Sequence, residues 1–147
     1  MRRTILIINV IFLVVIATTG DVAKAEHEDG IFPLKKTVTI TNTLESKAQL
    51  KLHCRSKDDD LGVRHLGYNQ SSRFKFRTDI FFRTLFYCSF EWRAGVPGGG
   101  KVHWDEVYND WEMNCIACKY IVKPFGLCKF NSQTHQYDKC GFWKNEH

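Results

Sequence analysis

The chain has 147 residues, of which 44% are hydrophobic and 25% charged, and its formal net charge is +5. This length suits one globular domain and excludes a large multidomain enzyme. The whole-chain pI of about 8.9 includes a basic N-terminus, whereas nucleic-acid-binding domains more often exceed a pI of about 9 with their cations on one face. The composition therefore predicts no nucleic-acid partner.

Residues 1–25 have the features of a secretory signal peptide. Residues 1–3 carry two arginines, residues 5–17 form an apolar run, and residues 23–25 read Ala-Lys-Ala, a small-x-small cleavage site. The apolar run is shorter than the roughly 18 residues that a membrane span needs. We expect cleavage to leave residues 26–147 as a single secreted domain with no membrane span.

Six cysteines lie in the expected mature chain, and an exported chain favours disulfides. Cys115-x-x-Cys118 alone also has the spacing of a redox pair or half a zinc site, but no second C-x-x-C and no thioredoxin-like context accompany it. The sequence predicts three structural disulfides, in one of fifteen connectivities. The six are Cys54, Cys88, Cys115, Cys118, Cys128 and Cys140.

Short apolar segments with a period of two residues predict strands at 36–43, 49–54, 73–77 and 84–92. Both faces of the 84–92 segment carry large apolar residues, which is typical of a central strand. In the 73–77 segment, apolar and cationic residues alternate strictly, so Phe74 and Phe76 are expected to face inward.

After a Gly- and Pro-rich loop at 94–100, the segment 101–108 is ambiguous: Val102 and Trp104 are expected inward and His103 outward if it is a strand. Segments 118–122 and 127–130 predict a closing hairpin. No long run has helical spacing. The predicted fold is all-β: a small, disulfide-stabilised antiparallel β-sandwich of six to eight short strands.

The segment 53–62, His-Cys-Arg-Ser-Lys-Asp-Asp-Asp-Leu-Gly, resembles the signature of the plant self-incompatibility protein family, also called S-protein homologues. The resemblance extends from about Thr37 to Cys128. It includes Val-Thr-Ile-Thr-Asn at 38–42, Phe-Lys-Phe at 74–76, the segment 84–92, Val-Tyr at 107–108, Cys-Lys-Tyr at 118–120 and Gly-Leu-Cys at 126–128. The family's four usual cysteines correspond to Cys54, Cys88, Cys118 and Cys128.

The resemblance implies a secreted β-sandwich that acts as an extracellular ligand in cell-cell signalling by binding a cell-surface receptor. The alternative is an apoplastic defence or carbohydrate-binding module. The cysteines beyond the usual four, Cys115 and Cys140, are expected to pair with each other. The simplest pairings for the rest are Cys54 with Cys88, which both face inward, and Cys118 with Cys128 across the closing hairpin.

Two loops are the predicted partner-binding sites, because loops on a rigid sandwich present charge to a partner. Lys57, Asp58, Asp59 and Asp60 form the first, and Arg93 and Lys101 bound the second. The aspartates could also bind Ca²⁺ or serve only as turn residues, but they lack the spaced ligand pattern of a calcium loop. We expect no metal and no other cofactor.

We predict no enzymatic activity. His53 and His103 are the best candidates for a general acid and base of a nuclease, but each has a simpler role in a strand, and no assembled catalytic motif is present.

Asn69-Gln70-Ser71 is an N-glycosylation sequon that lies between strands among polar residues, so Asn69 is a predicted glycosylation site. The sequence leaves the burial of Trp104, Trp111 and Trp143 open.

Overall fold

A computed structural model describes residues 34–112 and 115–144, and this part of the chain forms nine β-strands and no helix. None of it is therefore a helix that could span a membrane. The expected signal peptide lies outside the described residues. The strands are β1 Lys35–Asn42, β2 Leu50–Arg55, β3 Asp60–Leu66, β4 Ser71–Arg77, β5 Leu85–Glu91, β6 Val102–Asn109, β7 Ala117–Lys123, β8 Gly126–Asn131 and β9 Gln136–Phe142.

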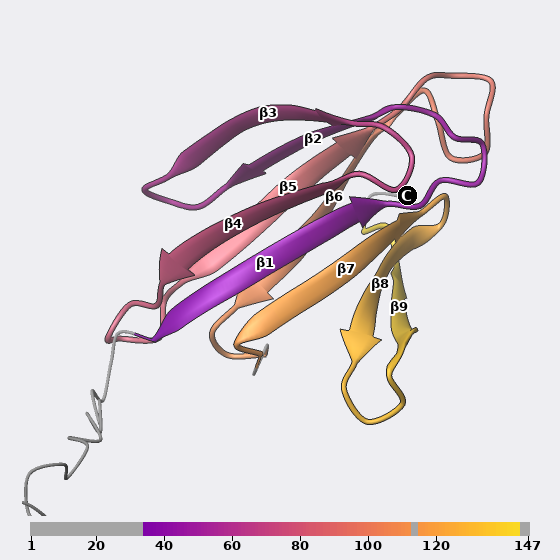
Figure 1. The fold of residues 1–147 in the computed structure, drawn as a ribbon. Coiled ribbons are helices and arrows are strands. Elements are labelled where there is room, and N and C mark those ends of the chain that lie inside the picture. Colours follow the sequence, from indigo (N-terminus) through magenta and orange to yellow (C-terminus); the bar gives the residue numbers. More distant parts are fainter. Residues whose placement is uncertain (1–33, 113–114, 145–147) are drawn as a thin grey trace, which may run out of the picture.

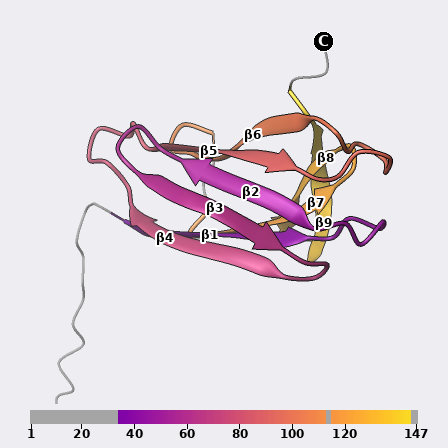
Figure 2. The ribbon, with the colours of Figure 1, turned by 90° about the horizontal axis from the view of Figure 1, so that it is seen from above.

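The strands form two sheets that pack face to face, as Figures 1 and 2 show. Sheet A has the order β4-β1-β7-β8-β9, and sheet B has the order β3-β2-β5-β6. All neighbouring strands are antiparallel except β1 and β7, which are parallel. This architecture confirms the all-β sandwich. The number of strands is nine, and the parallel pair is an exception to the antiparallel pattern.

Alternating residues of the inner strands make the core, as the period-two pattern predicts. On β1, Val38 and Ile40 are fully buried, while the threonines that alternate with them are only half-buried. On β5, Phe86, Cys88 and Phe90 are at most 2% exposed. These central strands therefore follow directly from their hydrophobic pattern.

Two edge strands, β3 and β9, were not expected from the sequence. Six of the seven residues of β3 are exposed or half-buried, and all seven of β9 are. An edge strand in solvent needs no apolar face, so it leaves no hydrophobic period in the sequence.

The expected register of β6 is wrong. Val102 and Trp104 are 42% and 37% exposed, whereas His103 is 1% exposed. The His103 ring lies between the indoles of Trp92 and Trp143, with centroids 4.9 and 4.8 Å away. Its Nε2 donates to the Gly98 carbonyl at 2.7 Å. These contacts satisfy a polar ring in the core, which makes histidine the inward residue.

Three disulfides are present, as expected, but only one of the three expected pairings is correct. Cys54 pairs with Cys88 between directly opposed residues of β2 and β5. Cys115 pairs with Cys118 and Cys128 with Cys140.

The register explains the error. Cys128 lies opposite Ile121 on β7, and Cys118 lies three residues away along that strand, a distance of about 10 Å. A disulfide needs Cα atoms within about 7 Å. On its other side Cys128 lies directly opposite Cys140 of β9, and their Cα atoms are 3.9 Å apart.

Asn42 ends β1 and joins three parts of the chain. Its fully buried side chain donates to the carbonyls of Ala48 and Leu66, both at 2.9 Å, and accepts from the Leu44 amide at 3.1 Å. Both polar atoms of this side-chain amide form hydrogen bonds, so its burial leaves no polar group unsatisfied. These bonds hold the β1–β2 connection against sheet B.

Candidate contact surfaces

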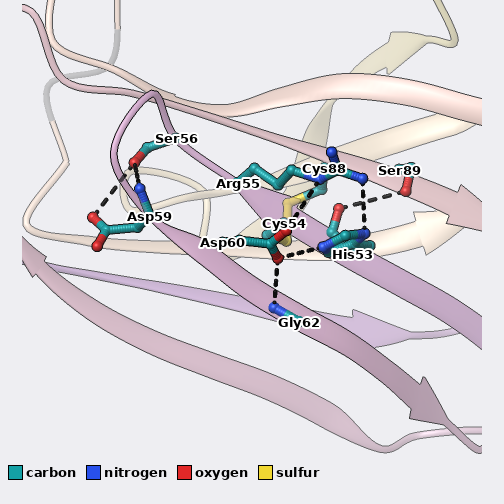
Figure 3. Close-up of polar contacts among 9 residues, drawn as sticks. All are labelled: His53, Cys54, Arg55, Ser56, Asp59, Asp60, Gly62, Cys88 and Ser89. Carbon is teal, nitrogen blue, oxygen red and sulfur yellow. Dashed lines mark hydrogen bonds and ion pairs between the residues drawn. A yellow bond between two sulfur atoms is a disulfide. The ribbon is translucent and has the colours of Figure 1, made fainter.

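The charged loop between β2 and β3 is a tight turn closed by Ser56, shown in Figure 3. The Ser56 amide donates to the Asp59 carbonyl at 2.8 Å. The Ser56 hydroxyl accepts from the amides of Asp58 and Asp59 at 3.3 and 3.0 Å. Lys57, Asp58 and Asp59 are all exposed. The Ser56 hydroxyl also donates to the Asp59 carboxylate at 3.4 Å. The side chains of Lys57 and Asp58 are therefore the most accessible to a partner, and Asp59 is exposed but tied to the turn.

Asp60 differs from its two neighbours because its carboxylate is part of the fold of this loop. It contacts His53 Nε2 at 2.5 Å and accepts from the Gly62 amide at 2.9 Å, with Arg55 Nε 3.8 Å away (Figure 3). The bond from His53, followed by that from Gly62, lowers the pKa of Asp60 below its usual range. Asp60 therefore positions the start of β3.

The second predicted loop lies at the other end of the sandwich. Along the β2–β5 pair, Arg55, next to the charged turn, lies opposite Tyr87. Glu91, which leads to the second loop, lies opposite Lys51, four residues further along the pair. Arg93 and Lys101 are exposed, and Arg93 lines an open groove of about 350 Å³. The structure thus does not bring the two predicted contact loops together.

The glycines of this loop allow it to fold back on the sandwich. The Gly100 amide donates to the Trp92 carbonyl at 3.0 Å, and the Trp92 indole donates to Pro97 at 3.1 Å. A Cβ on Gly99 would lie 2.0 Å from the Arg93 carbonyl oxygen. Only glycine permits this approach, so the loop is closed over Trp92.

A large apolar surface, missed in the sequence, occupies the same end as the charged turn. Of the thirteen large hydrophobic side chains exposed among the described residues, seven lie there. We call this surface the apolar end. It consists of Leu34, Ile80, Phe81, Phe82, Leu85, Trp111 and Ile116, which are 39–79% exposed.

Backbone hydrogen bonds connect the segments that carry the apolar end. The amide of Thr78 donates to Leu34, that of Asp110 to Thr84, and that of Thr37 to Ile116, at 2.9–3.1 Å. In Figure 1 these connections lie at the start of β1 and β7 and the finish of β4 and β6. Segments distant in sequence therefore meet at one end of the sandwich.

The loop that carries Ile80, Phe81 and Phe82 is held by Asp79. The Asp79 side chain accepts from the Phe81 amide at 2.7 Å and from Arg83 Nη2 at 2.9 Å. Its own amide donates to the Thr84 hydroxyl at 2.7 Å, and its carbonyl accepts from the Phe82 amide at 3.1 Å. Phe82 has φ of 55°, a conformation that costs a bulky residue about 1–3 kcal/mol. The loop is thus built to hold apolar side chains outward.

The two histidines considered as nuclease residues lie on opposite faces of sheet B. His53 faces outward beside Asp60, and His103 faces the core between two tryptophans. They cannot act together on one substrate atom. Among the described residues, no group of three or more His, Cys, Asp or Glu side chains is arranged to hold a metal ion.

Asn69 is exposed in the turn between β3 and β4, where its φ is 62° and its amide donates to the Asn42 carbonyl at 2.8 Å. The sequence did not predict the burial of three tryptophans, and the structure shows that it differs among them. Trp143 is 3% exposed, Trp104 is 37% exposed and Trp111 is 79% exposed.

Two packed sheets, three disulfides and loops at both ends define a small, disulfide-stabilised β-sandwich protein. The family model for plant self-incompatibility protein S1 matches residues 37–143. The chain therefore belongs to the plant self-incompatibility protein S1 family, as its motifs indicated.

Relatives in Arabidopsis thaliana support this assignment. S-protein homolog 2 is 33% identical, with 90% of this chain and 91% of that protein covered. S-protein homolog 3 is 40% identical, with coverage of 74% and 72%, and S-protein homolog 4 is 40% identical, with coverage of 75% and 73%.

A solved structure of SPH (Self-Incompatibility Protein Homologue) proteins has the same fold. It matches with a TM-score of 0.51 at 20% identity and covers 66% of this chain and 84% of its own. Those proteins are described as a widespread family of small, highly stable, secreted proteins from plants. The extracellular localisation expected for this chain agrees with that description.

Proposed function

We propose that this protein is a secreted ligand whose apolar end docks on a cell-surface receptor, without enzymatic activity. The gathering of seven exposed hydrophobic side chains at one end carries the proposal. Soluble monomers seldom expose contiguous apolar patches of this kind unless the patch binds a partner. A few residues carry most of the binding energy of an interface, and tryptophan, here Trp111, is enriched among them.

The charged turn at the same end would form the rim of this interface. Lys57, Asp58 and Asp59 are exposed at the tip of the turn, and rim charges act mainly on association rate and specificity. Arg93 and Lys101, at the opposite end, lie outside this interface. Asp60 acts through the turn that it holds in place.

We also propose that the domain is released by cleavage of residues 1–25 and that Asn69 carries a glycan. Asn69 lies at the end opposite to the apolar end, so a glycan there would leave the docking surface uncovered. N-terminal sequencing of protein from a plant secretory system should give Glu26 first, and glycosidase treatment should increase its gel mobility. An intact Met1 would contradict the proposed cleavage, and an unchanged gel mobility would contradict the proposed glycan on Asn69.

Binding to plant protoplasts, whose cell wall has been removed, tests the receptor proposal without a contribution from wall polysaccharides. Labelled protein should bind saturably and be competed by unlabelled protein. The double variant Phe81→Ser, Trp111→Ser should lose this binding. The matched control is Phe125→Ser, Phe142→Ser, which removes an exposed aromatic pair at the other end with ring centroids 5.9 Å apart.

Equal loss of binding in both variants, or full binding by the first, would contradict the proposal. Thermal unfolding of both proteins separates lost contact from lost structure, because substitutions at exposed sites leave stability nearly unchanged. Binding to isolated cell-wall glycans without any binding to protoplasts would support a carbohydrate-binding module instead.

A further inference from the structure

On the outer face of sheet A, the strands β4, β1 and β7 carry cations and no acidic residue. On β4, β1 and β7 the alternate residues point away from the core, since Val38, Ile40, Cys118 and Val122 are buried between them. The outward positions include five exposed cations and no Asp or Glu. The cations are Lys35, Arg73, Lys75, Arg77 and Lys119.

The cations form a regular array, which we call the cationic face. Arg73, Lys75 and Arg77 follow one another along one side of β4, about 6.8 Å apart. Lys35 lies opposite Arg77. On the other side of β1, Lys119 lies opposite Thr39, which itself lies opposite Arg73. No described segment crosses this face in Figure 1 or Figure 2.

A row of hydroxyls runs between the cations. Thr37, Thr39 and Thr41 point outward along β1, and Thr41 shares a hydrogen bond of 2.8 Å with Ser71 on β4. Hydroxyls both donate and accept hydrogen bonds, so the row can bind the hydroxyl groups of a sugar while the cations bind acidic groups.

The outer face of sheet B is different, because its charges are mixed and partly paired. Lys51 on β2 forms an ion pair with Glu91 on β5 at 3.0 Å, and His53 and Arg55 face Asp60. None of the five cations of the cationic face has a carboxylate partner in residues 34–112 and 115–144. Their field is therefore not neutralised by those neighbours.

We propose that the cationic face binds a linear acidic polysaccharide, a chain of uronate residues with regularly repeated carboxylates. A repeating polyanion can engage successive cations along one strand. The outward residues of β4, β1 and β7 include no aromatic side chain. On the neighbouring β8, the half-buried ring of Phe130 lies beneath Lys119, whose Nζ is 5.4 Å from the ring centroid. Binding of single-stranded nucleic acid relies on stacking of successive bases on aromatic rings, which β4, β1 and β7 do not provide. Ile121, half-buried, is the largest apolar side chain among them, which does not suit insertion into a membrane.

This inference is independent of the receptor proposal, because it concerns a different surface. Both surfaces could be occupied at once: the cationic face would hold the protein on an acidic matrix, and the apolar end would remain free. Weak, salt-dependent retention by a matrix would slow diffusion of a ligand away from its source.

Calorimetric titration with polygalacturonate at several salt concentrations tests the inference. The triple variant Arg73→Gln, Lys75→Gln, Arg77→Gln should bind roughly tenfold more weakly or worse, with a smaller slope of log affinity against log salt. The control Lys51→Gln, Arg64→Gln, Arg93→Gln removes the same charge from exposed residues of sheet B and its loops. It should bind within about threefold of the unaltered protein, because it leaves the cationic face intact.

Two further probes decide the ligand chemistry. Fully methyl-esterified polygalacturonate, which lacks the charge, should not bind. Arg73→Lys, Arg77→Lys, which keeps the charge, should retain most of the affinity and confirm that the triple variant lost charge and not structure.

Three results would overturn the inference. The first is no binding of polygalacturonate by the unaltered protein, and the second is equal weakening by the two triple variants, which would mean that only net charge matters. The third is binding of phosphatidylserine vesicles through these cations without binding of polygalacturonate, which would assign the face to a membrane surface.

Discussion

The two ends of the sandwich use the same kinds of side chain in opposite ways. At one end, which we call the tryptophan end, Trp92, His103 and Trp143 stack on one another and are at most 3% exposed. At the apolar end, Phe81 and Trp111 are 63% and 79% exposed. The difference shows that aromatic content alone does not distinguish a buried core from an exposed surface.

The backbone at each end explains the difference. At the tryptophan end, chain segments approach too closely for side chains: a Cβ on Gly98 would lie 2.5 Å from the Pro124 carbonyl oxygen. The indole of Trp143 also donates to that carbonyl, at 3.0 Å. At the apolar end, Asp79 holds a loop that turns Phe82 to a positive φ and its neighbours outward. The tryptophan end therefore buries its indoles in the core and leaves the pair Phe125 and Phe142 exposed, whereas the apolar end exposes seven large hydrophobic side chains.

Replacing one tryptophan at each end gives the largest expected difference. Trp92→Ala should lower the free energy of unfolding by about 3–5 kcal/mol, because it empties a buried site and breaks the bond to Pro97. Trp111→Ala should change it by less than about 0.5 kcal/mol, because this side chain is exposed. Urea unfolding of both variants measures the contrast. Similar losses in the two would refute the assignment of the ends.

A pair of glycines near the tryptophan end provides a smaller test. A Cβ on Gly126 would lie 1.7 Å from the Gly141 carbonyl oxygen, whereas one on Gly141 has nothing within 4 Å. Gly126→Ala should therefore destabilise the protein by about 1–3 kcal/mol or more, and Gly141→Ala by less than about 0.5 kcal/mol. Thermal unfolding monitored by circular dichroism compares them, and a tolerated Gly126→Ala would show that β8 and β9 are less tightly paired.

The smallest expected effect concerns the rim of the apolar end. The pKa of Asp60 in the folded protein is lowered chiefly by the bond from His53, so its contribution to stability is present above the unfolded pKa of about 4. It is lost as pH falls through the lower, folded value. This contribution is small because the carboxylate is exposed.

Carboxyl titration by NMR measures that shift directly. His53→Ala should raise the pKa of Asp60 towards its ordinary value. The pKa of Asp79, which is lowered mainly by the Phe81 amide, provides an internal control and should not move. If the pKa of Asp60 were unchanged in this variant, His53 would not be the residue that holds the start of β3.

The sequence predicted the central strands because burial leaves a period of two residues in β1, β2 and β5. It did not predict β3 and β9, whose edge positions demand no such pattern. The predicted inward and outward faces of β6 were exchanged, because histidine is a polar residue and was expected to face solvent. Its burial follows only from the stacking of His103 between Trp92 and Trp143 in the folded protein. The predicted pairing of two disulfides was wrong, because cysteine pairing depends on strand register, which the sequence does not show.

The sequence located only part of the surfaces that we propose as contacts. The charge of Lys57, Asp58 and Asp59 marked a loop correctly, but the role of Asp60 depends on its contact with His53 across β2 and β3. The run Ile80-Phe81-Phe82 was visible between polar turn residues, and it was the one local signal of the apolar end. Its association with Trp111 and Ile116 arises only from the fold.

Photo-crosslinking on living plant cells tests most directly which end makes the contact. Benzoylphenylalanine would replace either Phe81 at the apolar end or Phe125 near the tryptophan end, which are 63% and 46% exposed. We predict a specific crosslink to a membrane protein from position 81, suppressed by excess unlabelled protein, and none from position 125. A specific crosslink from position 125 alone would contradict the account.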